Sequence, residues 1–315
     1  MLLLACLAAL LFVVLLVVAA RRGGGDLGEE WPARVDTLPR LDPPPPLTRE
    51  ADSMRFEPWR LVSRVLANPG SAGGPLYRLS FEPEGDLPQW QAGAVACIYC
   101  GPAAEALDGG VAVAARLGHY MVGSLPEEEA VELVVRLRAD RSGRSDAAGG
   151  LRSQWLCEAV DTGQQVALAL RDDASFTPPP SNIPLILIGN ATGIAGLQAQ
   201  IKARPAGSRN WLIFGDRGSV DDEVLAAAIG GWVSSGHLER CDLVLPGEVR
   251  KQRRVTDQLA DASEAVLDWI FAGAAIYVCG SLPMGDDVNR MLAAQLGRDV
   301  LDAMRDQGLY RQALY

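Results

Sequence analysis

The chain has 315 residues, of which 49% are hydrophobic, and it carries 39 acidic against 29 basic residues for a formal net charge of −10. This length allows about two domains with sizeable cores. An acidic chain lacks the basic face that general nucleic-acid binding needs, so we expect no nucleic-acid partner. The six cysteines stand in apolar contexts without the pattern of a disulfide framework, which favours a reducing compartment.

The first segment is an uncharged, Leu- and Val-rich run over residues 2–20, followed at once by Arg21 and Arg22. Its length suits a helix that crosses a bilayer, and the basic pair places the rest of the chain on the cytoplasmic side. We therefore expect a single-pass anchor over residues 1–22 in the inner (cytoplasmic) membrane. A cleaved signal peptide is the alternative, although it normally begins with a basic region that is missing here.

Residues 23–55 hold consecutive glycines at 23–25 and consecutive prolines at 43–46, without hydrophobic periodicity. A proline run of this kind favours extended polyproline structure. We predict a semi-rigid linker between the membrane and a globular part that is cytoplasmic. A ligand for an SH3-type domain is the alternative.

The region from residue 56 to 180 is predicted to be β-rich. Short runs of β-branched and aromatic residues, separated by Pro, Gly and Asp turns, cover residues 60–66, 76–81, 94–99, 119–122, 131–137 and 165–170. Six such strands, with one short helix near residues 153–159, predict a small antiparallel barrel.

From residue 181 to 315, strand and helix patterns alternate. The predicted strands are 185–188, 211–214, 243–245 and 275–278, and the predicted helices are 194–204, 221–234, 255–271 and 286–306. This alternation predicts an α/β domain with a parallel sheet, helices on both faces, and ligands at the carboxyl ends of its strands. The fold class is therefore β plus α/β.

The turn after the first of these strands is the most informative stretch. The apolar run 185–188 stops at Gly189, small residues follow through Gly193, and a helical pattern begins at Ile194. A helix N-terminus offers free N–H groups and a positive dipole end, so a strand–turn–helix unit of this kind is typical of phosphate sites. A tight βα turn without a ligand is the alternative.

Further motifs follow one another along the chain. They are Trp90-Gln-Ala-Gly93, Gly150-Leu-Arg-Ser153, the stretch from Pro184 to Ala195, Asn210-Trp-Leu-Ile-Phe-Gly-Asp216, Ile276-Tyr-Val-Cys-Gly280 and the terminal Tyr315. As an ordered set over residues 59–315, they resemble the ferredoxin–NADP reductase superfamily, and most closely the flavoprotein subunit of sulfite reductase and related diflavin reductases. We expect a chain without the flavodoxin-like FMN domain of those larger relatives.

The resemblance implies an FAD-binding barrel over residues 56–180 and an NAD(P)-binding domain over residues 181–315. It implies hydride transfer from NADPH, or alternatively NADH, to FAD, and onward electron transfer to an acceptor. A flavodoxin-like protein, a haem protein or a quinone would suit, and the sequence does not distinguish them. The expected function is that of a membrane-anchored NAD(P)H oxidoreductase in electron transport.

On the flavin side, the family holds FAD with a turn that contains an Arg, a Tyr and a Ser. The corresponding residues are Gly118, Tyr120 and Met121, so only the Tyr is kept. Arg116 is a candidate to replace the lost charge, and an ordinary barrel aromatic is the alternative for Tyr120. The residues expected to contact FAD in this turn are Arg116, Tyr120, Met121, Val122 and Ser124.

A second FAD element is expected at Gly150 and Ser153, where the family brings a Ser and backbone N–H groups to the pyrophosphate at the start of a helix. A simple N-cap is the alternative for Ser153. Tyr315 resembles the terminal aromatic residue that stacks over the flavin ring and must move before the nicotinamide enters.

On the nucleotide side, the pyrophosphate turn is expected to bind through Gly189, Asn190, Thr192 and Gly193. Ala191 carries a Cβ where the family often has Gly, which would tighten the turn. Cys279 and Gly280 end the last predicted strand, where the family places a Cys beside the nicotinamide. A buried strand cysteine is the alternative.

A basic stretch over residues 250–254 is the candidate for the 2′-phosphate of NADPH. The guanidinium groups of Arg250, Arg253 and Arg254 suit a phosphate, although the family's Ser-Arg pair is replaced by Pro246 and Gly247. A solvated basic loop is the alternative.

The largest departure concerns the groups around the nicotinamide. The family's Ser, Cys and Asp are Met121, Cys279 and Ala313 here, so only the Cys is kept. Positioning alone can still support hydride transfer. The alternative is a catalytically weakened or non-catalytic membrane-tethered scaffold of the same fold. No metal site is expected, because the single pair Cys97 and Cys100 lacks further ligands.

Overall fold

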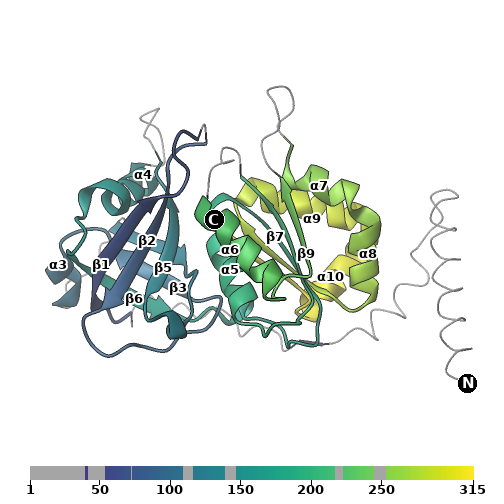
Figure 1. Cartoon of the computed structure of the whole chain (residues 1–315), viewed down its shortest axis with the longest axis horizontal. Helices are drawn as coiled ribbons and strands as arrows, with labels where there is room; N and C mark the ends of the chain where they lie inside the picture. The colour runs from purple at the N-terminus through teal and green to yellow at the C-terminus, as the bar shows by residue number, and fades with distance from the viewer. Residues whose placement is uncertain are drawn as a thin grey trace, which may run out of the picture.

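The computed structural model describes residues 40–41, 54–71, 73–108, 116–138, 147–216, 223–244 and 253–315. They form two sheet-based units that lie side by side (Figure 1). The predicted anchor at residues 2–20 and most of the predicted linker lie outside the described residues. Within the described ranges, none of the helices combines the length and the apolar character that a membrane span requires.

The first sheet is antiparallel and has the strand order β4-β3-β6-β1-β2-β5. Its strands are β1 (Glu57–Leu66), β2 (Leu76–Pro83), β3 (Val95–Tyr99), β4 (Leu117–Met121), β5 (Val131–Arg136) and β6 (Gln165–Arg171). The edge strands β4 and β5 are joined just beyond β4, where the Gly123 N–H donates to the Glu132 carbonyl at 2.8 Å. The six predicted antiparallel strands are confirmed.

The core of this sheet follows from side-chain alternation. Trp59 and Leu61 on β1, and Leu79 and Phe81 on β2, are at most 1% exposed and pack together inside it. Successive side chains of a strand point to opposite faces, so every second residue is buried here.

Two helices of this unit differ from the sequence prediction. Helix α3 (Ala103–Leu107) was not predicted. Helix α4 (Ala147–Gln154) begins before the predicted position and continues into a π-helical turn at Trp155–Ala159. The motif at residues 150–153 therefore lies inside a helix, and the expected helix start at Gly150 and Ser153 is wrong.

The second sheet is parallel and has the order β11-β10-β7-β8-β9. Its strands are β7 (Leu185–Asn190), β8 (Asn210–Gly215), β9 (Arg240–Val244), β10 (Ala275–Gly280) and β11 (Tyr310–Leu314). The first four match predicted strands. The edge strand β11 was missed, because its sequence is half polar and lies at the chain end, where the helix–strand alternation stops. The predicted boundary at residue 180 stays a prediction and falls between β6 and β7.

Helices cover both faces of the parallel sheet, with α5 and α6 toward the antiparallel unit and the others on the far side (Figure 1). They are α5 (Ile194–Lys202), α6 (Glu223–Ser234), α7 (Val255–Asp261), α8 (Ser263–Phe271), α9 (Leu282–Leu296) and α10 (Arg298–Asp306). The two longest predicted helices are each divided. The second division lies at Gly297, whose φ of 89° does not continue a helix.

Side chains of α5 and β8 hold the two units together. Gln198 and Lys202 both donate to the Gly123 carbonyl, at 2.7 and 3.1 Å. At the carboxyl end of β8, Asp216 accepts a hydrogen bond from Arg136 at 2.7 Å. One apolar cluster also runs across the boundary and includes Met121. The ends of the parallel strands thus lie against the antiparallel unit.

Candidate functional site

The turn after β7 is shaped by the end of β10. An ideal Cβ at Gly189 would lie 2.6 Å from the Cys279 carbonyl oxygen, and one at Gly193 would lie closer still. No real Cβ tolerates such distances, so glycine is required at both positions. Residues 191–193 make one 3₁₀ turn before α5. Ala191 has a φ of 51°, in the left-handed region, as expected for a residue that replaces a glycine.

Asn190 braces this turn against the next strand end. Its Oδ1 accepts from the Ser281 N–H at 3.0 Å, and its Nδ2 donates to the Ser281 hydroxyl at 3.0 Å. Ser281 precedes α9. Gly280 has a φ of 144°, and a Cβ there would collide with Asn190 Oδ1. The Asn190 amide therefore holds the strand ends of β7 and β10 in register.

Cys279, Tyr315 and Thr192 meet at these strand ends. The Tyr315 hydroxyl lies beside Cys279 Sγ and Thr192, and Gly196 of α5 lies next to the same sulfur. Cys279 is 0% exposed, whereas Tyr315 is 44% exposed as a whole residue. The phenol therefore points inward while the chain end stays open to solvent.

Both acidic groups of this contact are protonated at neutral pH. Burial raises the pKa of Cys279 to about 12, with the Tyr315 hydroxyl and the Gly196 N–H acting weakly against it. Burial also raises the pKa of Tyr315 well above its ordinary value. The sulfur is therefore a thiol and not a thiolate nucleophile.

The antiparallel unit contributes Met121 to the same place. The side chain is 8% exposed, and its Cε lies 3.2 Å from an ideal Cβ on Gly196, which is 3.0 Å from Cys279 Sγ. We name Met121, Thr192, Gly196, Cys279 and Tyr315 the strand-end cluster. Its barrel member brings no polar group, because the side chain is a thioether. Ala313, beside Cys279 on β11, brings none either.

Tyr120 lies on the opposite face of β4 from Met121. It is half-buried against the barrel core, and its ring covers Gly118, where an ideal Cβ would lie 2.5 Å from Tyr120 Cε2. The ring thus fills the space that a side chain at residue 118 would take. Burial raises the pKa of Tyr120, so the phenol keeps its proton.

Ser153 uses its hydroxyl within the fold. Its Oγ accepts from the Arg138 N–H at 3.1 Å and donates to the Gly150 carbonyl at 3.1 Å, and the residue is 4% exposed. It lies in the last turn of α4, so the N-cap alternative is also wrong. Tyr120 on β4 and Ser153 on α4 lie where these two elements pack together, whereas Cys279 and Tyr315 are part of the strand-end cluster. The predicted residues thus form two groups, which meet at β4.

Two further residues predicted to contact FAD are internal to the barrel. Val122 is 1% exposed and packs in the core. Ser124 is 0% exposed, and its hydroxyl accepts from the Glu132 N–H at 2.9 Å. The Ser124 carbonyl also accepts from the Trp90 indole at 3.0 Å. These contacts give both residues a structural reason to be present.

Arg116 turns toward α3, whereas Arg152, for which no role was predicted, reaches β4. Arg116 pairs with Glu105 at 3.1 Å and lies over the Tyr99 ring at 5.9 Å, beside α3. Arg152 reaches from α4 to β4, where its Nη1 donates to the Leu117 carbonyl at 2.6 Å. Arg152 was not among the predicted site residues, although a charged residue within the Gly150–Ser153 motif was a signal.

The basic stretch is described only in part, because Arg250 lies outside the described residues. Arg253 forms an ion pair with Asp261. Arg254 immediately precedes α7, and its side chain is 74% exposed. Its Nη1 lies 3.7 Å from Oδ2 of Asp287 in α9. Both guanidinium groups are therefore near carboxylates, and that of Arg254 is open to solvent.

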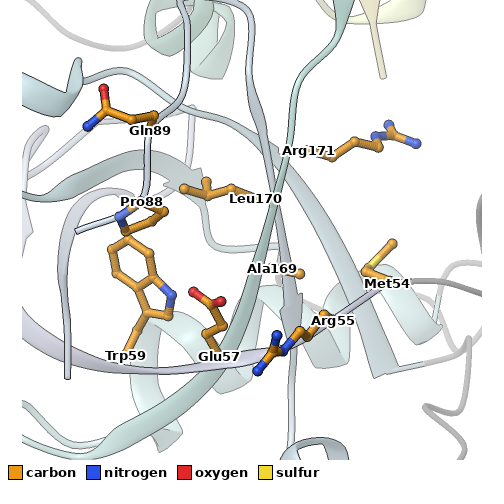
Figure 2. A pocket seen from close by; sticks show the side chains of 9 residues that line it. All are labelled: Met54, Arg55, Glu57, Trp59, Pro88, Gln89, Ala169, Leu170 and Arg171. Atoms are coloured by element: carbon orange, nitrogen blue, oxygen red, sulfur yellow. The ribbon is translucent and has the colours of Figure 1, made fainter. Parts of the chain in front are cut away.

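A separate hollow of about 350 Å³ lies by the start of β1 and the end of β6. Glu57 and Trp59 line it, but the guanidinium groups of Arg55 and Arg171 point away from each other (Figure 2). None of the predicted site residues lines this hollow. In the described part of the chain, no group of three or more His, Cys, Asp or Glu residues is placed to hold a metal ion.

Comparisons with known proteins agree with these observations. No family model matches the chain. It is 30% identical over 214 residues to the sulfite reductase (NADPH) flavoprotein alpha-component of Mannheimia succiniciproducens, a match that covers 62% of this chain and 36% of that protein. The corresponding Salmonella arizonae protein is 34% identical over 169 residues, which cover 52% and 27%. The chain thus spans only about a third of the length of these relatives.

Solved structures extend the likeness to the whole globular part. The ferredoxin–NADP⁺ reductase of Plasmodium falciparum superposes with a TM-score of 0.63 at 14% identity, over 82% of this chain and 96% of that one. The same enzyme with 2′P-AMP gives 0.62 at 12% identity. The fold is therefore that of the ferredoxin–NADP reductases. In sequence, the chain is related to the flavoprotein component of sulfite reductase, as its motifs predicted.

Proposed function

We propose that the chain is an FAD-dependent NAD(P)H oxidoreductase, which takes a hydride from a nicotinamide and passes electrons to a protein or small acceptor. The strand-end cluster carries this proposal. It brings Met121 of the barrel against Cys279 and Tyr315 at the carboxyl ends of the parallel strands, where such sheets bind ligands. The relatives are NADPH-dependent flavoproteins by name, which supports these cofactors.

The residues on the barrel side fit a flavin nucleotide. Tyr120 offers an aromatic ring, and the guanidinium groups of Arg138 and Arg152 lie near it. Cations of this kind suit the phosphates of FAD. Bound FAD would supply the hydride and electron chemistry, and the chain's own residues would supply binding and orientation.

On the nucleotide side, the turn at residues 189–193 presents the N-terminal N–H groups of α5, which suit a pyrophosphate. Cys279, as a neutral thiol, bounds the nicotinamide position without a charge. Tyr315 would have to withdraw its hydroxyl from Cys279 and Thr192 before a ring could reach this place. These contacts make Tyr315 the gate of the proposed site.

NADPH is the proposed donor, with NADH as the alternative. Arg253 and Arg254 follow Arg250 in the basic stretch, and a 2′-phosphate would replace the carboxylate partners of the two described residues. The variant Arg254→Ala is expected to raise KM for NADPH about tenfold while leaving KM for NADH within a factor of two. Equal changes for both nucleotides would count against a phosphate role.

We propose that residues 2–20 anchor the chain in the inner membrane, with the globular part in the cytoplasm and the acceptor at the same face. The uncharged run before Arg21 and Arg22 supports this. In fractionated cells, the full chain is expected with the membranes and a chain that begins at residue 23 in the soluble fraction. Cleavage after the apolar run would indicate a signal peptide instead.

A non-catalytic scaffold of the same fold is the second candidate, favoured by the apolar Met121 and Ala313 beside Cys279. The absorption spectrum of the purified full chain, before and after NADPH, separates the two. Flavin bands that NADPH bleaches, with reduction of ferricyanide, support the reductase. Bound flavin that NADPH leaves oxidised supports the scaffold, and a colourless protein that cannot be loaded with FAD contradicts the reductase.

A further inference from the structure

Arg152 occupies a distinctive place between α4 and β4. Its Nη1 donates to the Leu117 carbonyl at 2.6 Å, immediately before Gly118. The side chain is half-buried, in contrast to most arginines of a surface helix. A guanidinium group carries five donors in a fixed fork, so one side chain can hold a backbone carbonyl and bind a ligand at the same time.

A second guanidinium comes from a different element. Arg138 follows β5, and its backbone N–H donates to Ser153 Oγ at 3.1 Å. Ser153 is the residue that follows Arg152 in the chain. Its carbonyl lies 3.7 Å from an ideal Cβ on Gly150, so this segment packs on α4. Both guanidinium groups act to lower the pKa of Tyr120, against the larger opposing effect of burial. Both guanidinium groups therefore act electrostatically on Tyr120, and they come from two segments that pack together at α4.

The surroundings suit a phosphate better than a neutral ligand. Gly118 leaves β4 without a charged side chain at this point, and Arg116 is engaged with Glu105 on the side of α3. A phosphate accepts paired N–H groups from an arginine fork, and a half-buried site strengthens that attraction relative to bulk water.

We infer that Arg152, together with Arg138, binds the phosphate part of the flavin nucleotide, and that this pair supplies the charge absent at Gly118. This inference deepens the proposed function and rests on it. It assigns specificity to the nucleotide portion of the ligand: FAD and FMN carry a phosphate that Arg152 can bind, whereas riboflavin does not. Tyr120 would then contact the ring and Arg152 the phosphate of the same ligand.

The test is a flavin titration of the full chain after its bound flavin has been removed. Binding is measured by the quenching of flavin fluorescence. FAD, FMN and riboflavin are compared for the native chain, for Arg152→Gln, and for Arg116→Gln as the matched control from the same region. Arg152→Gln is expected to weaken FAD and FMN binding about tenfold or more and riboflavin binding less than twofold. Arg116→Gln should leave all three affinities unchanged.

Salt gives a second readout that a merely structural role would not move. FAD affinity of the native chain should fall with added NaCl, and the dependence should be weaker in Arg152→Gln, because one fewer ionic contact is screened. Arg152→Lys should restore part of the FAD affinity. Unchanged melting temperatures would show that the variants keep the fold.

Three results would overturn the inference. Equal FAD affinity in the native chain and in Arg152→Gln would remove Arg152 from the site. Equal losses for FAD and riboflavin would make its effect structural, through the bond to Leu117. If the native chain binds none of the three flavins, the proposed function itself fails, and the inference falls with it.

Discussion

The two turns that face each other across the interface are held in different ways. After β7, residues 189–193 are fixed by backbone: the Cys279 carbonyl approaches Gly189 and Gly193 more closely than any side chain would allow. After β4, the turn is tied to its own sheet by backbone and to the other unit by side chains, since the Gly123 carbonyl accepts from Gln198 and Lys202.

The difference teaches where this chain can depart from its relatives. Side chains can adjust to a neighbour, whereas a backbone contact cannot, so glycines stay at 189 and 193 while the barrel turn carries Gly118 and Met121 in place of the family's Arg and Ser. Glycine is therefore required at residues 189 and 193. Strand β4 has no such constraint, so a replacement such as Arg152 can arise beside it.

The largest effect is expected from adding a methyl group to the turn after β7, with the turn after β4 as the comparison. Gly193→Ala would drive a Cβ into the Cys279 carbonyl and should lower the free energy of unfolding by about 3 kcal/mol. Gly123→Ala meets the end of the flexible Gln198 side chain and should cost about 1 kcal/mol. Urea unfolding measures both.

The control for these variants is Gly230→Ala. Nothing lies within 4 Å of an ideal Cβ at this position in α6, and its φ is not positive. Replacing a helical glycine by alanine should raise stability by about 0.5–1 kcal/mol. Equal losses for Gly193→Ala and Gly123→Ala would remove the distinction between a backbone-held and a side-chain-held turn.

The ion pair between Arg136 and Asp216 joins the two units, and breaking it is expected to have the next largest effect. The side chains are only 20% and 10% exposed. Arg136→Gln should lower the free energy of unfolding by about 2 kcal/mol, because it removes a cation from beside a largely buried carboxylate. A double-mutant cycle with Asp216→Asn isolates the coupling. An additive cycle would mean that the pair does not hold the units together.

Much of the fold could be predicted from local patterns. The six antiparallel strands and four of the five parallel ones follow from alternation and apolar runs, since those patterns report which face is buried. Strand β11 could not be predicted, because its pairing with β10 is a long-range contact that its own residues do not encode. The division at Gly297 was missed for a related reason: periodicity continues across it.

The candidate site was predictable where backbone geometry dictates the residue and where the family motifs name it, as for Cys279 and Tyr315. Gly193 and Ala191 could be interpreted correctly because a tight turn limits φ and Cβ. Arg116 could not be placed from sequence, since an arginine side chain spans several ångströms and Glu105 decides where it goes. Arg152 was overlooked because its contact with β4 depends on the packing of α4 against that strand, which the sequence does not show.

Unfolding at alkaline pH shows how strongly a buried thiol is desolvated in the strand-end cluster and in the barrel. Burial raises the pKa of Cys279 and of the barrel residue Cys157 to about 12, from 9.0 when solvated. As pH rises, the thiols of the unfolded chain lose their protons before those of the folded chain. Their contribution to the free energy of unfolding is therefore complete below about pH 9 and is lost as pH rises toward 12. At pH 10 each thiol should account for roughly 1 kcal/mol of lost stability.

The measurement is the fall in unfolding free energy between pH 8 and pH 10, for the native chain, Cys279→Ala and Cys157→Ala. Each variant should show a fall smaller by roughly 1 kcal/mol if both thiols are equally desolvated. A smaller difference for Cys279→Ala alone would show that water enters the strand-end cluster, as expected of a site that opens to a ligand.

The smallest effect concerns Ala191, which with Glu129 is one of two non-glycine residues at positive φ in the described ranges. The left-handed conformation costs an alanine about 1 kcal/mol. A glycine avoids this cost but loses up to about 1 kcal/mol of stability, because its unfolded state has more conformational entropy. Ala191→Gly should therefore stabilise the chain by only about 0.5 kcal/mol. Glu129→Gly, in an exposed barrel loop at a φ of 61°, is the matched variant. If Ala191→Gly destabilises the chain while Glu129→Gly does not, the Ala191 methyl makes a contact that stabilises the turn, in addition to the bonds of the Asn190 amide.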